Sequence, residues 1–316
     1  GGAGLAMPQL YKLGILGSVS RRIDDVCHRS QFGSGFGPRI GINRYDADGT
    51  NTLLLRDDLL SLSAFTIAPV TAGTGVSPVV DTDYFLARMP GVEIPQRAKA
   101  FYYDYYNAVV SHPIPEHDAA GPPPLGLVED YQFTRENTDH PIKFSFTGPF
   151  SLARKVRNEA YEREADLVMA FAHVLNREAR ALAAAGVTIL QVDEPLLAGY
   201  PERAALAVRA INAVFDGVDP KTTLRAVHVC YGNRYARPLW EGHYDFLFPP
   251  ILDATIDHLV LEFARKGYDD LELFRRYDTG RLVLGLGVID VKSPDVEPAD
   301  LVAARVRRAL DILPPD

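Results

Sequence analysis

The residues best suited to chemistry lie in the stretch 224–233, which reads Leu-Arg-Ala-Val-His-Val-Cys-Tyr-Gly-Asn. Its β-branched residues and the glycine after them predict a buried strand that runs into a loop, and the two-residue period of a strand puts His228 and Cys230 on one face. An imidazole and a thiolate together are suitable ligands for Zn²⁺. The spacing alone is a weak signal in a chain with 8 histidines, and by itself it favours a buried structural pair.

Predicted strands and helices alternate regularly on both sides of this stretch, and they are the elements that must position it. Strands are expected at 142–147, 187–192, 224–230, 259–263 and 282–286. Helices are expected at 97–110, 159–185, 202–215, 269–277 and 299–313. Strands separated by helices in this way indicate right-handed βαβ units and a parallel sheet. We therefore predict an α/β protein with the (β/α)₈ architecture of a TIM barrel.

The strand count leaves this barrel one strand short. Two further strands, near 13–16 and 62–69, bring the count to seven, and an eighth should follow the last helix, where the sequence stops at Asp316. We expect the polypeptide to continue past Asp316. Residues 1–316 are interpreted as one barrel domain, with the opening residues 1–10, which begin Gly-Gly-Ala-Gly, as a disordered or non-native lead-in.

The amino-acid composition argues against several classes of binding partner for this protein. With 33 basic and 41 acidic side chains the formal net charge is −8, and no basic run is present, which argues against nucleic acid and anionic membranes as partners. No apolar run reaches the roughly 18 residues of a membrane helix, and no export signal is recognisable. Two cysteines make no disulfide framework, so we expect a cytoplasmic protein.

Polar residues gather where the predicted strands end, which is where TIM barrels carry their catalytic groups. These residues are Gly17, Ser18, Asp193, Glu194, His228, Cys230, Glu262, Asp290 and Lys292. The acids Asp193, Glu194 and Glu262 could merely be charges neutralised within a barrel mouth, but their positions at strand ends favour function. Lys292 could equally be an ion-pair partner of Asp290 or of Glu297.

From residue 141 onward the chain resembles the catalytic barrel of cobalamin-independent methionine synthase and its short, single-barrel relatives. Four motifs carry the resemblance in type, order and spacing: Gln191-Val-Asp-Glu-Pro, His228-Val-Cys-Tyr-Gly-Asn, Leu261-Glu-Phe-Ala and Leu284-Gly-Leu-Gly-Val-Ile-Asp-Val-Lys-Ser-Pro. In the first 140 residues the resemblance is limited to Gly17-Ser18.

The resemblance implies zinc-dependent transfer of an alkyl group, methyl above all, to a small-molecule thiol such as homocysteine, which gives methionine. It also implies a zinc ion held by His228, Cys230, Glu262 and a second Cys after the last helix. Zinc lowers the pKa of a coordinated thiol, so the substrate binds as a thiolate and an open coordination position lets it enter.

The family also assigns roles around the thiol substrate. Asp193, with Glu194 beside it, is expected to hold the ammonium of homocysteine, and Gly17 and Ser18 are expected to meet its carboxylate. Lys292 stands where the full-length synthases carry a catalytic His that transfers a proton to the departing folate. A lysine there is a feature of the short relatives, and it puts a folate donor in doubt.

Two departures from the family pattern, Lys292 and the absence of a fourth zinc ligand, keep alternative functions open. No Cys follows Cys230, so the fourth zinc ligand is missing from the sequence. The donor could be a methyl-folate, a methyl-corrinoid protein, another sulfonium or an epoxide. One alternative function is therefore an epoxide-opening thiol transferase of the epoxyalkane:coenzyme M type, and another is a metal-free barrel without this activity.

Overall fold

The computed structural model describes the chain from residue 85 to residue 313, apart from short gaps at 87, 95–96, 101–102, 107, 116–122, 139–141, 234–236, 281 and 294. The strands predicted near 13–16 and 62–69 lie outside the described residues. So do Gly17 and Ser18, whose expected contact with a substrate carboxylate stays a prediction.

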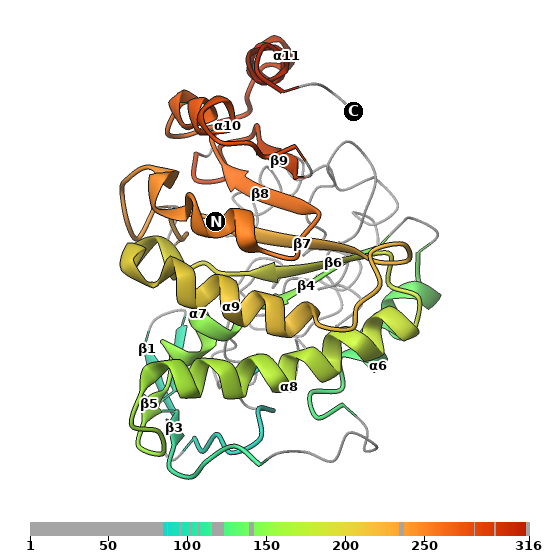
Figure 1. Ribbon diagram of the computed structural model, residues 1–316, viewed down its shortest axis with the longest axis vertical. Coiled ribbons are helices and arrows are strands. Elements are labelled where there is room, and N and C mark those ends of the chain that lie inside the picture. The colour runs from blue at the N-terminus through green and yellow to red at the C-terminus, as the bar shows by residue number, and fades with distance from the viewer. Residues whose placement is uncertain are drawn as a thin grey trace, which may run out of the picture.

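Five parallel strands form the main sheet, in the order β4-β6-β7-β8-β9. Their bounds are β4 Lys143–Thr147, β6 Ile189–Asp193, β7 Leu224–Val229, β8 His258–Glu262 and β9 Val283–Gly287. Each strand pairs with the next one in this order, as consecutive βαβ units require. The predicted α/β class with a parallel sheet is confirmed. In the described part of the chain the sheet runs open from β4 to β9 (Figure 1).

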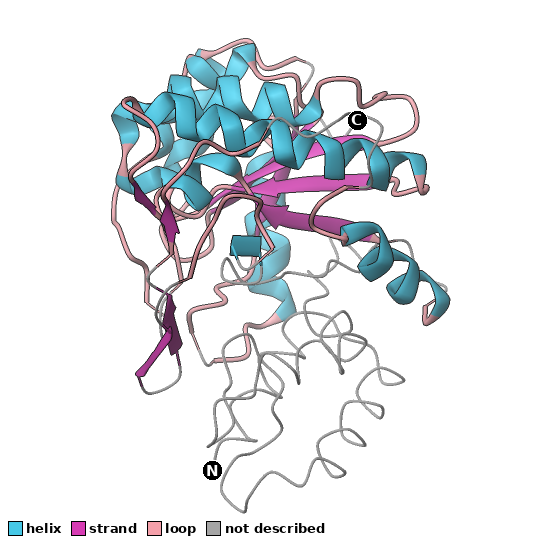
Figure 2. Ribbon diagram, turned by 90° about the horizontal axis from the view of Figure 1, so that it is seen from below, coloured by secondary structure: helices cyan, strands magenta, loops and turns pink. Residues whose placement is uncertain are grey.

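Helices connect these strands and cover one face of the sheet. The longest helix, α8 (Glu164–Ala184), and α9 (Ala204–Phe215) lie side by side along that face (Figures 1 and 2). The other α-helices are α6 Leu127–Glu136, α7 Pro149–Ala153, α10 Leu273–Arg276 and α11 Ala299–Leu310. Short 3-10 turns are η2 Leu197–Gly199, η3 Pro201–Arg203, η4 Tyr244–Leu247, η5 Pro250–Asp253 and η6 Asp269–Glu272. None of the helices described here combines the length and the apolar character needed to cross a bilayer.

The helix predicted from residue 159 begins later, at Glu164. The side-chain oxygen of Asn158 accepts hydrogen bonds from the backbone N–H groups of Ala160 (3.3 Å) and Tyr161 (3.0 Å). Asn side chains compete with helical hydrogen bonding in this way, so the chain turns before it can begin the helix.

The helix predicted at 97–110 is wrong. The segment forms an antiparallel hairpin of β1 (Arg97–Ala100) and β2 (Tyr103–Tyr106), and then β3 (Val109–Val110), which pairs in parallel with β5 (Arg157–Asn158). Tyrosine and valine favour extended backbone, and this preference outweighed the helical spacing of the apolar residues.

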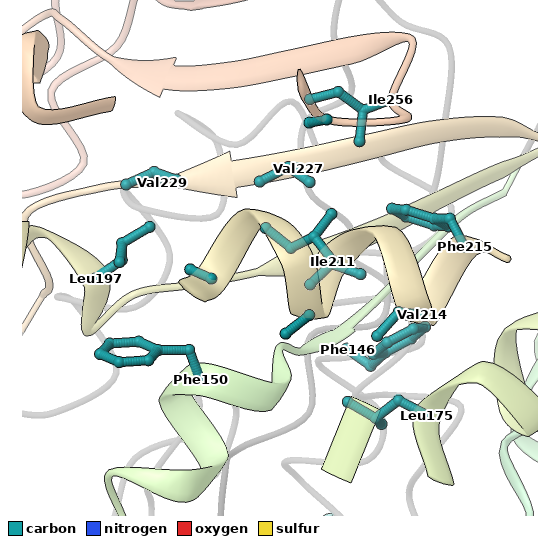
Figure 3. Close-up of a cluster of buried hydrophobic side chains, with 14 of the residues drawn as sticks. Phe146, Phe150, Leu175, Leu197, Ile211, Val214, Phe215, Val227, Val229 and Ile256 are labelled. Carbon is teal, nitrogen blue, oxygen red and sulfur yellow. The ribbon is translucent and has the colours of Figure 1, made fainter. Parts of the chain in front are cut away.

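The core lies between the sheet and its helices. On β4, Phe144 and Phe146 are 0% and 1% exposed and point toward the helix layer, while Ser145 between them points to the opposite face. Figure 3 shows the apolar side, where Phe146 lies near Leu175 of α8 and Val214 of α9. The sheet therefore has an apolar outer face under the helices and a polar inner face.

Candidate active site

The inner face of the sheet brings the sequence-predicted groups of β6 and β7 together. In the strand register Asp193 is the partner of Thr147 on β4 and of His228 on β7. Because all three strands are parallel, these residues end at the same edge. The arrangement puts a carboxylate and an imidazole beside each other at the carboxyl end of the sheet.

Asp193 is held by side chains of the inner face. The amide nitrogen of Gln191 donates to Asp193 Oδ1 (2.6 Å), and Ser145 is a second hydrogen-bond partner. Burial raises the pKa of Asp193, against the charges of His228 and Lys143 and the two hydrogen bonds, which lower it. Gln191 Oε1 is buried and has no hydrogen-bond partner in the part of the chain that the structure describes.

His228 is oriented from the neighbouring strand. Its Nδ1 donates to the carbonyl oxygen of Val260 (3.1 Å), which leaves Nε2 for other partners. Burial would lower the pKa of His228, but the charge of Cys230, a hydrogen bond with Cys230 and the charge of Asp193 raise it to about 9. Asp193, His228 and Cys230 therefore form one electrostatically connected group.

Glu262 ends β8, next to this group, and it is already in an ion pair. Its Oε1 lies 2.6 Å from Lys292 Nζ, and its Oε2 accepts a 3.3 Å hydrogen bond from the backbone N–H of Tyr231, the residue after Cys230. The sequence suggested Asp290 or Glu297 as the ion-pair partner of Lys292, and this prediction is wrong, because the partner is Glu262. Asp290 accepts the backbone N–H of Lys292 instead (2.9 Å).

Glu297, the other expected partner of that lysine, pairs with Arg305 on α11 at 2.6 Å. The sequence could not reveal the true partner, because Lys292 and Glu262 are 30 residues apart and meet only through the fold.

Glu194 points away from this group, into the helix side. It is fully buried, and its oxygens accept hydrogen bonds from the backbone N–H of Phe150 (3.0 Å), the backbone N–H of Ser151 (2.8 Å) and the Ser151 hydroxyl (2.6 Å). Burial raises its pKa to about 7, although these bonds act in the opposite direction. Gly148 leaves room for the carboxylate, since a Cβ there would overlap Glu194 Oε1. These contacts give Glu194 a structural task and do not support the substrate contact expected for it.

An aromatic cluster that the sequence did not predict joins three loops at the same edge. The Arg154 guanidinium lies 4.2 Å from the centre of the Tyr200 ring, and the Tyr200 and Trp240 rings are 6.3 Å apart. Any side chain at residue 199 would overlap the Trp240 indole, so this close contact requires Gly199. The one useful signal in the sequence was that Trp240 is the single tryptophan of the chain.

The predicted zinc ligands fit a zinc ion in their chemistry. A His that donates Nδ1–H to a backbone carbonyl and keeps Nε2 free is the usual orientation of a zinc ligand, and Cys230 contacts this imidazole. Glu262 lies on the adjacent strand but is bound to Lys292. Within the described residues no three His, Cys, Asp or Glu side chains are arranged around a common point. The ligand roles of His228, Cys230 and Glu262 stay predictions.

Fold and site together define an α/β domain of the barrel type, with acid, imidazole and thiol groups at the carboxyl ends of its parallel strands. Residues 81–316 match the family described as cobalamin-independent synthase, catalytic domain, and the chain belongs to this family.

Similar proteins agree with this assignment. The chain is 30% identical over 236 residues to a methionine synthase of Pyrococcus abyssi, covering 74% of this chain and 64% of that protein. It is 32% identical over 192 residues to a methionine synthase of Saccharolobus solfataricus, covering 60% and 53%. The chain thus spans less than two thirds of the length of these relatives.

A solved structure shares the fold. It is a B12-independent methionine synthase from Shewanella sp. W3-18-1 in complex with selenomethionine, with a TM-score of 0.61 and 24% sequence identity, over 85% of this chain and 77% of that one.

Proposed function

We propose that this domain transfers a methyl group to the sulfur of homocysteine, with a zinc ion held by His228, Cys230 and Glu262. The observation that carries the proposal is the connected group of Asp193, His228 and Cys230 at the ends of β6 and β7. A zinc ion bound there would make a coordinated thiol a thiolate at neutral pH. The printed names of the relatives, methionine synthases, point to the same reaction.

In this proposal Asp193 recognises the thiol substrate. Its carboxylate would accept charge-assisted hydrogen bonds from the ammonium of homocysteine, while Gln191 and Ser145 keep it in place. A carboxylate at this position favours an amino thiol over a sulfonated thiol of the coenzyme M type, because two negative charges would repel each other. Gly17 and Ser18 would bind the substrate carboxylate.

Lys292 is the proposed proton donor to the group that leaves the methyl. Its Nζ lies in the loop between β9 and α11, 2.6 Å from the proposed zinc ligand Glu262. This role applies to a methyl-folate, whose nitrogen must gain a proton as it leaves. A methyl-corrinoid protein or a sulfonium, the other open methyl donors, would leave without one.

One assay tests the function. Zinc-loaded protein is incubated with homocysteine and each methyl donor in turn, and methionine is measured. Methionine from one donor, lost with Asp193→Asn, supports the proposal. Alkylated coenzyme M from an epoxide, without methionine from any donor, would establish the alternative reaction, and the absence of every product from zinc-loaded protein would leave the inactive barrel as the correct description.

A further inference from the structure

The ion pair between Lys292 and Glu262 is among the most protected in the described part of the chain. Nζ and Oε1 are 2.6 Å apart, and the two side chains are 4% and 12% exposed. Most other ion pairs have at least one side chain that is well exposed. A lysine buried to this extent needs its partner, because an unpaired ammonium without water is costly.

The loop that carries Lys292 is braced from both sides. The Lys292 N–H donates to Asp290 Oδ1, and the Asp290 N–H donates to Glu297 Oε2 (3.0 Å). Glu297 in turn pairs with Arg305 of α11, whose Nη1 also donates to the carbonyl of Val288 (2.6 Å). The fold of this loop therefore fixes where the Lys292 ammonium lies. The side chain does not move freely as a lysine on the surface would.

The carboxylate that Lys292 holds is a proposed metal ligand, and both of its oxygens are engaged, Oε1 by the ammonium and Oε2 by the backbone N–H of Tyr231. Coordination through Oε1 would therefore compete directly with Lys292. A zinc ion binds a carboxylate oxygen at about 2.0–2.2 Å, with no room for an ammonium on the same lone pairs. Arg265 Nε is 3.8 Å from Glu262 Oε1 and has no hydrogen-bond partner among the described residues, so positive charge remains beside the carboxylate in either state.

We propose that Lys292 is the counter-ion of Glu262 in the metal-free protein and that a zinc ion displaces its ammonium from the carboxylate on binding. This inference rests on the proposed zinc site. Lys292 then lowers the affinity for zinc, since the ion pair must break before Glu262 can coordinate. The same exchange frees the ammonium for the methyl donor, so the proton donor becomes available only when the site is loaded.

The test compares zinc binding by metal-stripped wild-type protein and Lys292→Met, each titrated with zinc against a chelator of known affinity. We expect Lys292→Met to bind zinc about tenfold tighter or more, because removal of the ammonium leaves the buried Glu262 carboxylate without its nearest positive charge, which zinc restores. Its metal-free form should melt at a lower temperature than wild type, and zinc should raise that temperature more than it does in wild type. Lys292→Gln, neutral but still a hydrogen-bond donor, serves if Lys292→Met does not fold.

Arg225→Met is the matched control. It breaks another partly buried ion pair, Arg225 with Asp257 (2.9 Å), at the amino ends of β7 and β8 and so at the opposite edge of the sheet from the proposed zinc ligands. It should lower stability and leave zinc affinity unchanged. Zinc affinity that is equal or weaker in both Lys292 variants overturns the inference while the proposed function survives. Tighter zinc binding by the Lys292 variants, together with no methyl transfer by zinc-loaded wild-type protein, supports the inference and refutes the function. No zinc binding by wild type or by any variant refutes both.

Discussion

Asp193 and Glu194 are neighbours in the sequence, yet their side chains lie in two regions that hold a buried carboxylate in different ways. Asp193 lies on the inner face of the sheet, where its partners are other side chains. Glu194 lies on the helix side, where backbone N–H groups of α7 satisfy it. Both acids have a raised pKa because burial penalises their charge.

The difference teaches how to separate a binding group from a structural one. A carboxylate bonded to backbone amides cannot leave them without disrupting a helix start, so it is fixed. A carboxylate bonded to a Gln and a Ser can exchange these partners for a ligand at a smaller cost. The unpartnered oxygen of Gln191 belongs to the inner region as well, and that region is where we expect substitutions to affect activity more than stability.

The largest effect is expected from Cys230→Ser. It should lower methyl transfer by at least about a thousandfold, equivalent to roughly 4 kcal/mol, because a hydroxyl is a poor zinc ligand compared with a thiolate. Circular dichroism and thermal melting should show an intact fold. Activity within tenfold of wild type would remove Cys230 from the site and with it the contrast between the two regions.

Glu194→Ala should cost stability and not recognition. It leaves two backbone N–H groups of α7 and the O–H of Ser151 without an acceptor and opens a cavity, so we expect the free energy of unfolding to fall by about 3–5 kcal/mol in urea titration. Glu178→Ala is the matched control, since Glu178 is also buried and accepts the backbone N–H groups of Leu125 (2.5 Å) and Leu127 (3.2 Å). A stable Glu194→Ala protein with a raised substrate KM would mean that the residue binds substrate after all.

Glu194 also makes a testable contribution to the pH dependence of stability. Its pKa is about 7 in the folded protein, against an ordinary value of 4.5, so the folded state keeps a proton that the unfolded state loses between these pH values. This contribution is complete below about pH 4.5 and is lost as the pH rises through 7, by up to about 3 kcal/mol. Glu194→Gln should flatten the stability profile between pH 4.5 and 7 by this amount. Parallel profiles for the two proteins would contradict the assignment.

Asp193→Asn should act on the substrate alone. Loss of the negative charge should raise the KM for homocysteine about a hundredfold, or roughly 2.7 kcal/mol, with zinc content and unfolding midpoint close to wild type. Steady-state kinetics with varied homocysteine gives the answer. Unchanged kinetics would exclude an amino thiol as the substrate.

Much of the fold could be predicted from the sequence, because the buried parallel strands are apolar runs bounded by clear turn residues. All five strands of the main sheet lie within two residues of their predicted bounds. The wrong predictions arose where a local preference outweighed hydrophobic periodicity. The Asn158 side chain makes α8 begin later than predicted, and the tyrosines favour extended backbone at 97–106.

The site was predictable in its composition but not in its partners. His228, Cys230 and Asp193 could be found because strand ends bring them to one edge. The separate tasks of Asp193 and Glu194 depend on which face each side chain takes, and the pairing of Lys292 with Glu262 depends on contact between distant loops. Neither property is encoded by local spacing.

The contact between Gly199 and Trp240 has a consequence for how this sequence can vary. Because a side chain at 199 would overlap the indole, a larger residue at 199 is acceptable only together with a smaller residue at 240. The two positions should therefore covary among related chains, and single exchanges at either one should be rarer than paired exchanges. Gly199 ends the η2 turn, and Trp240 lies in the loop that follows Cys230. Sequence changes in the η2 turn are therefore constrained by a residue in the loop after the neighbouring strand.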